Sequence, residues 1–252
     1  ELADSFFDSS ESGRHTVAAV GNAHTDTAVK KFGTASLQLD GTGDYLTTTD
    51  SSDWDFGTGN WTIEFWVRFT GGLGAPQRII NFSANTSPSI GGMIESGTDN
   101  KLVYYDQQLD TTWRKWCYDT NAYVVDTWYH YAVVRNGSVF TMFRDGVEQE
   151  SDGTSSTSIS SAHGPYIGTN RSEAGFTTGY IDELRISNIA RYSPPGFAVA
   201  TEEFANDKDT LLLLHMDGAN DGTSFPDSSG HTITANGDVA NTRAQLYTVE
   251  SF

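Results

Sequence analysis

The stretch 61–69 constrains the fold of this chain more than any other part of the sequence. Large apolar side chains occupy every second position, at Trp61, Ile63, Phe65, Val67 and Phe69. Polar side chains and one further tryptophan occupy the positions between them. Because side chains alternate between the two faces of a strand, this pattern predicts a central β-strand with one buried face. Such a strand requires a sheet and a second layer to cover it.

The rest of the sequence repeats this kind of signal at short intervals, between turns rich in glycine, asparagine and aspartate. Further strands are predicted at 35–39, 45–47, 78–82, 92–95, 102–105, 128–135, 139–144, 147–150, 166–168, 179–186 and 211–216. Asn136-Gly137 and Asp145-Gly146 predict tight hairpin turns, and a third hairpin is expected around the glycine turn 40–44. Short strands without alternating long helices favour an all-β, antiparallel two-sheet sandwich.

Charge and cysteine content exclude several classes of function. The 252 residues include 33 acidic and 15 basic side chains, a formal net charge of −18. This charge repels phosphate backbones and anionic lipid, so nucleic acid is not an expected partner. No apolar run approaches the length of a membrane span, and we recognise no signal peptide. The single cysteine, Cys117, excludes an intrachain disulfide.

The strand 179–186 places a carboxylate in an unusual position. Strict alternation puts Asp182 on the same face as Tyr180, Leu184 and Ile186. A buried carboxylate needs a partner, because an unpaired charge in apolar surroundings costs several kcal/mol. The expected partners are backbone N–H groups, an arginine or a hard cation.

The end of the chain repeats its beginning. Residues 224–235 echo 5–10 and 13–19, and the turn 193–196, Ser-Pro-Pro-Gly, marks a predicted domain edge. The sequence therefore predicts one sandwich over residues 1–200. Residues 201–252 are predicted to form an extension that carries the opening elements of a second sandwich, including a buried strand.

Taken together, several segments resemble a known family. They are 32–37, 39–46, 65–67, 128–130 with 132–135, 145–146 and 181–186. The sequence resembles the laminin-G-like, concanavalin-A-like jelly-roll domains found in tandem in phage, viral and bacterial surface proteins. The resemblance covers about residues 5–192 and implies a jelly-roll sandwich. It does not imply one ligand, because the superfamily includes lectins, glycan-cleaving enzymes, adhesins and structural domains.

In such arrays a strand like 211–218 precedes a segment like 223–235 and then the body of the domain. The candidate assembly strand is Leu211, Leu212, Leu213, Leu214, His215 and Met216. Folding back onto its own sandwich would set residues 224–235 in competition with 5–19, which favours donation to a neighbouring domain or another copy. A fragment whose ends were set by cleavage is the alternative.

A calcium ion is the first candidate ligand. Asp40 and Asp44 lie on the glycine turn, and Asp182 faces inward. Carboxylate and carbonyl oxygens suit Ca²⁺, and the resemblance implies a structural ion in many relatives. In the alternative interpretation, Asp40 and Asp44 stabilise their turn, while Asp182 accepts backbone hydrogen bonds or pairs with Arg185 or Arg191.

Carbohydrate is the second candidate ligand. An aromatic cluster includes Tyr104, Trp113, Trp116, Tyr118 and Tyr123, with Tyr105, Arg114 and Lys115 beside it. Sugars stack on exposed aromatic rings that have polar groups nearby. Aromatic residues of sandwiches are more often part of the core, and Trp113 and Trp116 cannot both face outward from a regular strand.

Catalysis is not expected. The resemblance implies that glucanases of the superfamily carry Glu-x-Asp-x-x-Glu on one strand, and this triplet is absent from the sequence. We therefore expect a non-catalytic, extracellular or virion-surface module that recognises glycan within a repeat array. The alternative is a structural subunit that donates its strand around 210–217 and builds a filament or shell.

Overall fold

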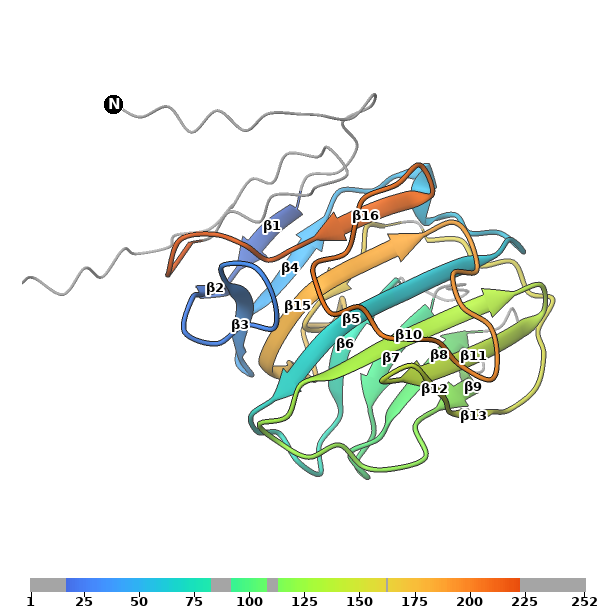
Figure 1. The fold of residues 1–252 in the computed structure, drawn as a ribbon, viewed down its shortest axis with the longest axis horizontal. Helices are drawn as coiled ribbons and strands as arrows, with labels where there is room; N and C mark the ends of the chain where they lie inside the picture. Colours follow the sequence, from blue (N-terminus) through green and yellow to red (C-terminus); the bar gives the residue numbers. More distant parts are fainter. Residues whose placement is uncertain (1–16, 83–91, 108–112, 162, 223–252) are drawn as a thin grey trace, which may run out of the picture.

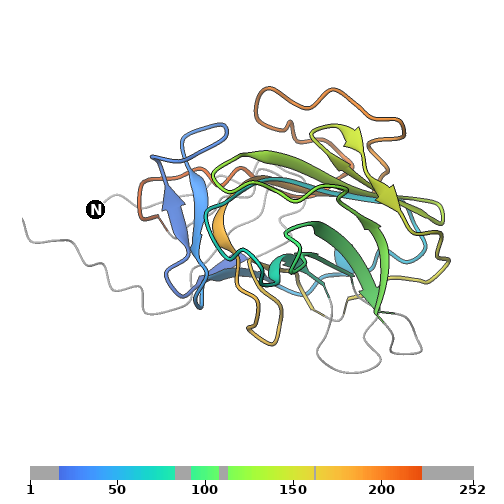
Figure 2. The ribbon, with the colours of Figure 1, turned by 90° about the horizontal axis from the view of Figure 1, so that it is seen from below.

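The protein is a sandwich of two antiparallel sheets, as the sequence predicts (Figure 2). A computed structural model describes residues 17–82, 92–107, 113–161 and 163–222. Within these residues there is no α-helix, and a short 3₁₀ turn, η1 (Ser52–Trp54), precedes β5. Consistent with this, no helix in the described part of the chain has the length and apolar character needed to cross a membrane.

Sheet A contains eight strands, each antiparallel to its neighbours. Their spatial order is β1 (Val17–Val20), β4 (Tyr45–Thr48), β14 (Tyr166–Ile167), β6 (Gln77–Asn81), β7 (Gly92–Ser96), β8 (Leu102–Gln107), β9 (Trp113–Tyr118) and β13 (Glu150–Ser151). Neither β1 nor β9 was predicted from the sequence. Strand β9 lacks a clean alternation of apolar residues. Strands β7 to β9 carry the candidate site.

Sheet B is the second layer. Its order is β12 (Val147–Glu148), β11 (Val139–Arg144), β10 (Tyr129–Asn136), β5 (Trp61–Phe69), β15 (Thr178–Ser187), β3 (Ser36–Asp40) and β2 (His24–Asp26), and β16 (Thr210–Leu214) also pairs with β15. The ten-residue β15 holds two neighbours on one side: its first half bonds to β3 and its second half to β16. Strand β5 pairs with β15 along the other side.

The main core lies between the two sheets and confirms the alternation of β5. All five of its odd-numbered apolar residues, Trp61 to Phe69, are at most 1% exposed and belong to one cluster. An aromatic chain links the layers: the Trp61 ring lies 5.4 Å from that of Tyr104, which lies 5.3 Å from that of Phe140. Burial of such side chains supplies most of the driving force for folding.

Two predicted hairpins are confirmed and one is wrong. Strands β10 and β11 pair across Asn136-Gly137, and β11 and β12 pair across Asp145-Gly146. The turn 40–44 does not close a hairpin, because β3 belongs to sheet B and β4 to sheet A. This turn carries the chain from one layer to the other, and an alternating pattern cannot distinguish these two connections.

A long connection covers the outer face of sheet B. Residues 188–209, which we call the strap, leave the end of β15, cross the sheet and return to β16 (Figure 1, orange). Its apolar side chains complete two clusters on that face: Phe204, Val199 and Ala200 with Trp66, and Ala190, Tyr192 and Phe197 with Phe143. The turn predicted as a domain edge is therefore part of a cover for the sandwich.

The strap is fixed to the sheet by a buried carboxylate. Glu64 of β5 is fully buried; its Oε1 accepts from the Arg185 guanidinium at 2.7 Å, and its Oε2 accepts from the Tyr192 hydroxyl at 2.7 Å. His130 Nε2 lies 3.3 Å from Glu64 Oε2. Burial by itself would raise the pKa of Glu64, but the His130 hydrogen bond and the Arg185 charge lower it below its usual value. Arg185 in turn donates to the strap carbonyl of Ala205 at 3.0 Å.

We predict that Glu64→Gln destabilises the protein by about 3–5 kcal/mol, because it leaves the buried Arg185 without a counter-charge. Urea unfolding at neutral pH measures the change, and the exposed Glu202→Gln is the control, with little expected effect. Equal stability of both variants would show that this ion pair does not hold the strap.

Strand β16 pairs within its own chain, and its donation to a neighbour stays a prediction. Leu184, Arg185 and Ile186 of β15 pair with Leu214, Leu213 and Leu212 of the same chain. Of the candidate assembly strand, Leu211 is 7% exposed, Leu212, Leu213, Leu214 and Met216 are fully buried, and His215 is half-buried. Residues 5–19 and 224–235 were expected to compete for one place in the sandwich. Nearly all of both segments lies outside the described residues, so this expectation stays a prediction.

We predict that Leu212→Ala costs about 2–5 kcal/mol, the usual result of a cavity left by a leucine in a packed core. Leu73, which is 56% exposed, gives the matched control, and Leu73→Ala should cost less than about 0.5 kcal/mol. Urea unfolding compares the two. If Leu212→Ala also had no effect, β16 would not contribute to this core.

Candidate functional site

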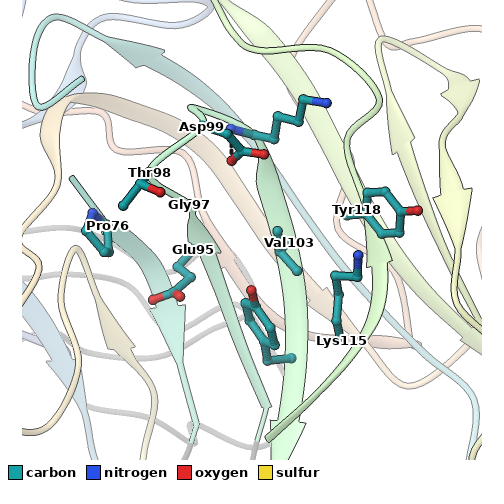
Figure 3. Close-up of a pocket in the computed structure, with 10 residues that line it drawn as sticks. Pro76, Glu95, Gly97, Thr98, Asp99, Val103, Lys115 and Tyr118 are labelled. Carbon is teal, nitrogen blue, oxygen red and sulfur yellow. Dashed lines mark hydrogen bonds between the residues drawn. The ribbon is translucent and has the colours of Figure 1, made fainter. Parts of the chain in front are cut away.

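An open groove crosses the outer face of sheet A. It has a volume of about 440 Å³ and is formed by β7, β8 and β9 together with the turn between β7 and β8. Figure 3 shows Glu95, Val103 and Lys115 side by side on the three strands, with Thr98 and Asp99 at the turn and Tyr118 at the far side. A concave surface that combines rings with a few polar groups is the usual form of a small-ligand site.

Strand alternation and one irregularity place these side chains outward. Val103 pairs with Tyr118, but the register then shifts, so that Tyr105 pairs with Lys115. The extra residue on β9 is accommodated while Trp116 and Cys117 both remain buried. A bulge of this kind re-aims the side chains beyond it. As a result, β9 presents both Lys115 and Tyr118 to the groove.

One wall of the groove contains a partly buried acid. Glu95 pairs with Arg78 of β6, whose Nε lies 3.2 Å from the Glu95 Oε2. Burial raises the pKa of Glu95, and the Arg78 charge opposes this effect. Burial and the nearby Glu95 charge also raise the pKa of the Tyr105 phenol. The groove therefore offers a carboxylate and a neutral phenol side by side.

Both lysines that line the groove are already engaged by the protein. The Lys115 Nζ lies 3.5 Å from the centre of the Tyr118 ring and 3.1 Å from Asp152 Oδ2. The Lys101 Nζ donates to the Thr120 carbonyl at 2.8 Å. These contacts hold the aliphatic stems of the lysines against the groove while their charges are satisfied.

The structure separates the predicted aromatic cluster into two groups. Tyr104, Trp116 and Tyr123 are 1%, 8% and 4% exposed and pack in the main core, so their rings are not available as a sugar platform. Tyr118 lines the groove, and Trp113, 43% exposed, projects from the same strand β9. Trp113 and Tyr118 are the part of the prediction that remains open.

Sequence reasoning missed the acidic side of this groove. Glu95 lies opposite Val103 in the register of β7 and β8, and the turn residues Gly97 and Asp99 connect these strands. The sequence showed two short strands flanking a turn rich in glycine and asparagine, a hairpin signal. Pairing the two runs as a hairpin would have placed Glu95 next to the aromatic segment.

The acids of the turn 40–44 act as turn formers. Asp44 is 1% exposed; it accepts from the Asn22 N–H at 2.8 Å and from the Asp40 N–H at 3.1 Å. Asp40 accepts from the Thr42 N–H at 2.7 Å. Burial raises the pKa of Asp44, and the two backbone hydrogen bonds oppose the rise. These contacts correspond to the alternative in which the acids stabilise the loop.

Asp182 is buried but not on the predicted face. The register of β15 with β5 shifts between Asp182 and Arg185, and Glu183 has a φ of 50°. This bulge breaks the alternation: Ile181 and Leu184 enter the main core, whereas Asp182 lies opposite Trp66 on the strap side. The pattern of apolar residues alone does not reveal a bulge.

The bulge is held by contacts on its outer side. Glu183 is fully buried; it accepts from the Phe204 N–H of the strap at 2.7 Å and lies 2.7 Å from His215 Nδ1. Burial lowers the pKa of His215, but the Glu183 hydrogen bond and charge raise it above its usual value overall. The unusual φ of Glu183 is thus compensated by ties to the strap and to the residues after β16.

The three predicted metal ligands do not form one site. Asp40 pairs with Thr178 on β15, and Asp182 lies four residues further along that strand, roughly 13 Å away at the rise of a β-strand. Across the described ranges, no three His, Cys, Asp or Glu side chains come together in a way that suits a metal ion. The set Asp40, Asp44 and Asp182 therefore does not fit one shared calcium ion, and calcium binding by the protein stays a prediction.

Burial makes Asp182 an unusually weak acid. Oδ2 accepts from the Lys31 N–H at 2.7 Å and the Phe32 N–H at 3.2 Å, whereas the buried Oδ1 has no hydrogen-bond partner within the described residues. Burial outweighs these two hydrogen bonds and raises the pKa of Asp182 to about 8, from 3.8 in an unperturbed carboxyl. The carboxyl therefore keeps its proton at neutral pH.

We predict that Asp182→Asn stabilises the protein at pH 8 by about 1–3 kcal/mol. Between pH 3.8 and 8 the folded wild type holds a proton that the unfolded chain releases, so its stability falls as the pH rises through this window. The amide does not titrate, and its advantage should shrink toward pH 4. Urea unfolding at pH 4.5, 6 and 8 tests this, with the exposed Asp50→Asn as the control. A difference independent of pH would contradict the assignment.

The sequence matches one protein family. The concanavalin A-like lectin/glucanases superfamily, in its laminin-G form, matches residues 40–194. This segment is more than half of the chain and includes β4 to β15 and the whole groove, so the protein belongs to this superfamily. The fold and the resemblance predicted from the sequence are thereby confirmed. Among proteins with curated descriptions, none matches the chain.

Solved structures share the fold at low sequence identity. The binding domain of botulinum neurotoxin serotype D is 13% identical, with a TM-score of 0.55 over 71% of this chain and 44% of that chain. Domain 4 of AbnA, an extracellular arabinanase from Geobacillus stearothermophilus, crystallised with arabinotriose, is 19% identical, with a TM-score of 0.54 over 71% of this chain and 84% of that chain.

A second toxin structure adds a different ligand. The binding domain of botulinum neurotoxin DC, in complex with SialylT, is 14% identical, with a TM-score of 0.54 over 71% of this chain and 44% of that chain. The chain thus spans less than half of the toxin chains it matches. At these identities the similarity establishes the fold.

Proposed function

We propose that this protein is a non-catalytic carbohydrate-binding module and that the groove on β7, β8 and β9 is its binding site. The observation that carries the proposal is the position of Tyr105, Tyr118 and Lys115 on one outward face, with the partly buried Glu95 across from them. Rings supply the apolar surface on which a pyranose or furanose stacks, and the polar groups fix its hydroxyls.

The extent of the surface supports an oligosaccharide ligand. Trp113 is exposed at the other end of β9 from Tyr118, and Lys115 lies between them. Strand β9 rises about 3.3 Å per residue, so the two rings are roughly 15 Å apart, the length of about three sugar units. Tyr118 in the groove and Trp113 beyond it, at the two ends of β9, suit a short glycan better than a single sugar.

Two comparisons agree with this proposal. Domain 4 of AbnA was solved with arabinotriose and a toxin binding domain with SialylT, and this chain matches 84% of the first chain and 44% of the second. Such domains act as surface or secreted modules, and we extend to this chain an extracellular or virion-surface location. Pairing of β16 within its own chain gives no support to the alternative of a strand-donating filament.

A purely binding role suits the acids of the groove better than catalysis. Glycoside hydrolysis needs two carboxylates flanking the scissile bond, one to donate a proton and one to act as base or nucleophile. Here Glu95 is paired with Arg78, and Asp99 accepts from the Lys101 N–H within the turn at 3.3 Å. The acids are arranged as hydrogen-bond acceptors.

We predict that Tyr118→Ala weakens oligosaccharide binding roughly tenfold, because a lost stacking surface is worth about 1–2 kcal/mol. Tyr118→Phe keeps the ring and should keep most of the affinity, which makes it the matched control. A glycan array with neutral and sialylated oligosaccharides identifies a ligand, and calorimetry then measures the three proteins. An array without any bound glycan would argue against the proposed function, as would a ligand indifferent to both substitutions.

A further inference from the structure

The charges of the groove are balanced in a way that bears on the class of its ligand. Four charged side chains line it, Glu95 and Asp99 with Lys101 and Lys115, and their formal charges cancel. The two cations are engaged: Lys115 by Asp152 and the Tyr118 ring, and Lys101 by the Thr120 carbonyl. A ligand carboxylate would have to share each ammonium, which has three donors, with these existing partners.

The acid of the groove, by contrast, has spare capacity. A carboxylate has about four lone-pair positions, and Arg78 approaches Glu95 from one side at 3.2 Å. The Glu95 Oε2 is buried beside Arg78, so a ligand must approach the other oxygen, Oε1, of a side chain that is 14% exposed. A sugar hydroxyl can donate to this oxygen, and the neighbouring Tyr105 hydroxyl can act as donor or acceptor beside it.

The electrostatic field of the whole protein also disfavours an acidic ligand. The chain carries a formal net charge of −18, and Asp152 adds a further negative charge beside Lys115. A carboxylated or sulfated sugar would be repelled on approach and would bring an unpaired anion close to Glu95. A ligand that consists of hydroxyl and ether groups meets neither obstacle.

We propose that the groove takes neutral, hydroxyl-rich oligosaccharides and discriminates against acidic ones, with Glu95 as the acceptor that binds the sugar hydroxyls. This inference rests on the proposed function. A groove of this kind differs from a site for sialic acid in which a cation pairs with the ligand carboxylate.

Matched oligosaccharide pairs that differ in charge test the inference on the full chain. Calorimetry at 0.15 M salt compares cellohexaose, xylohexaose and arabinohexaose with hexagalacturonate, and lactose with 3′-sialyllactose. We expect at least one neutral probe to bind ten times or more tightly than its acidic counterpart. Equal or tighter binding of the acidic probes would overturn the inference and leave the proposed function intact. Binding of no probe, up to millimolar concentration, would instead overturn the proposed function, and the inference with it.

A substitution at the acceptor tests the mechanism of discrimination. Glu95→Gln keeps the size of the side chain and one acceptor oxygen, but it removes the negative charge and frees Arg78. We expect at least fivefold weaker binding of the neutral probe, together with a preference for neutral over acidic probes that is at least fivefold smaller. Glu202→Gln, at an exposed position of the strap, is the control, and a thermal melt confirms that each variant is folded. An unchanged preference in a folded Glu95→Gln variant would refute the role of Glu95.

Discussion

The outer half of this sandwich depends on the buried charge of Glu64. A carboxylate in the middle of a central strand is unfavourable unless its hydrogen-bonding capacity is met, and Arg185, His130 and Tyr192 meet it from three different segments. Two of these partners lie on strands of the sheet and the third on the strap. Through Tyr192, the hydrogen bonds of Glu64 tie the strap of some twenty residues to the sheet. The strap in turn covers two further apolar clusters.

Local sequence patterns predicted part of this fold. The strand 61–69, the turns at Asn136 and Asp145 and the two-sheet class follow from local patterns, and the structure confirms them. The prediction that failed depended on contacts distant in sequence. The turn 40–44 links two sheets instead of closing a hairpin. Periodicity describes which residues are buried, but not which strand lies beside which.

The candidate site shows the same division. The aromatic segment was recognised, but strand periodicity did not separate its core rings from its surface rings, because a bulge in β9 changes which residues face outward. For the same reason, periodicity assigned Asp182 to the wrong face of β15, because a bulge at Glu183 changes which residues face the core. In both strands the irregularity lies where polar side chains gather, one beside the groove and the other beneath the strap. Local departures from the regular pattern thus position the polar groups of this protein.

The order of strands along the chain also matters for how the protein is made. Strand β15 is flanked on one side by β3, synthesised early, and by β16, which follows the strap and is the last strand described. The four leucines of β16 are buried, some in the core between the sheets and one against the strap that covers sheet B. During translation β15 therefore lacks this partner until residue 214 has left the ribosome, and stable folding of the sandwich must await the synthesis of β16.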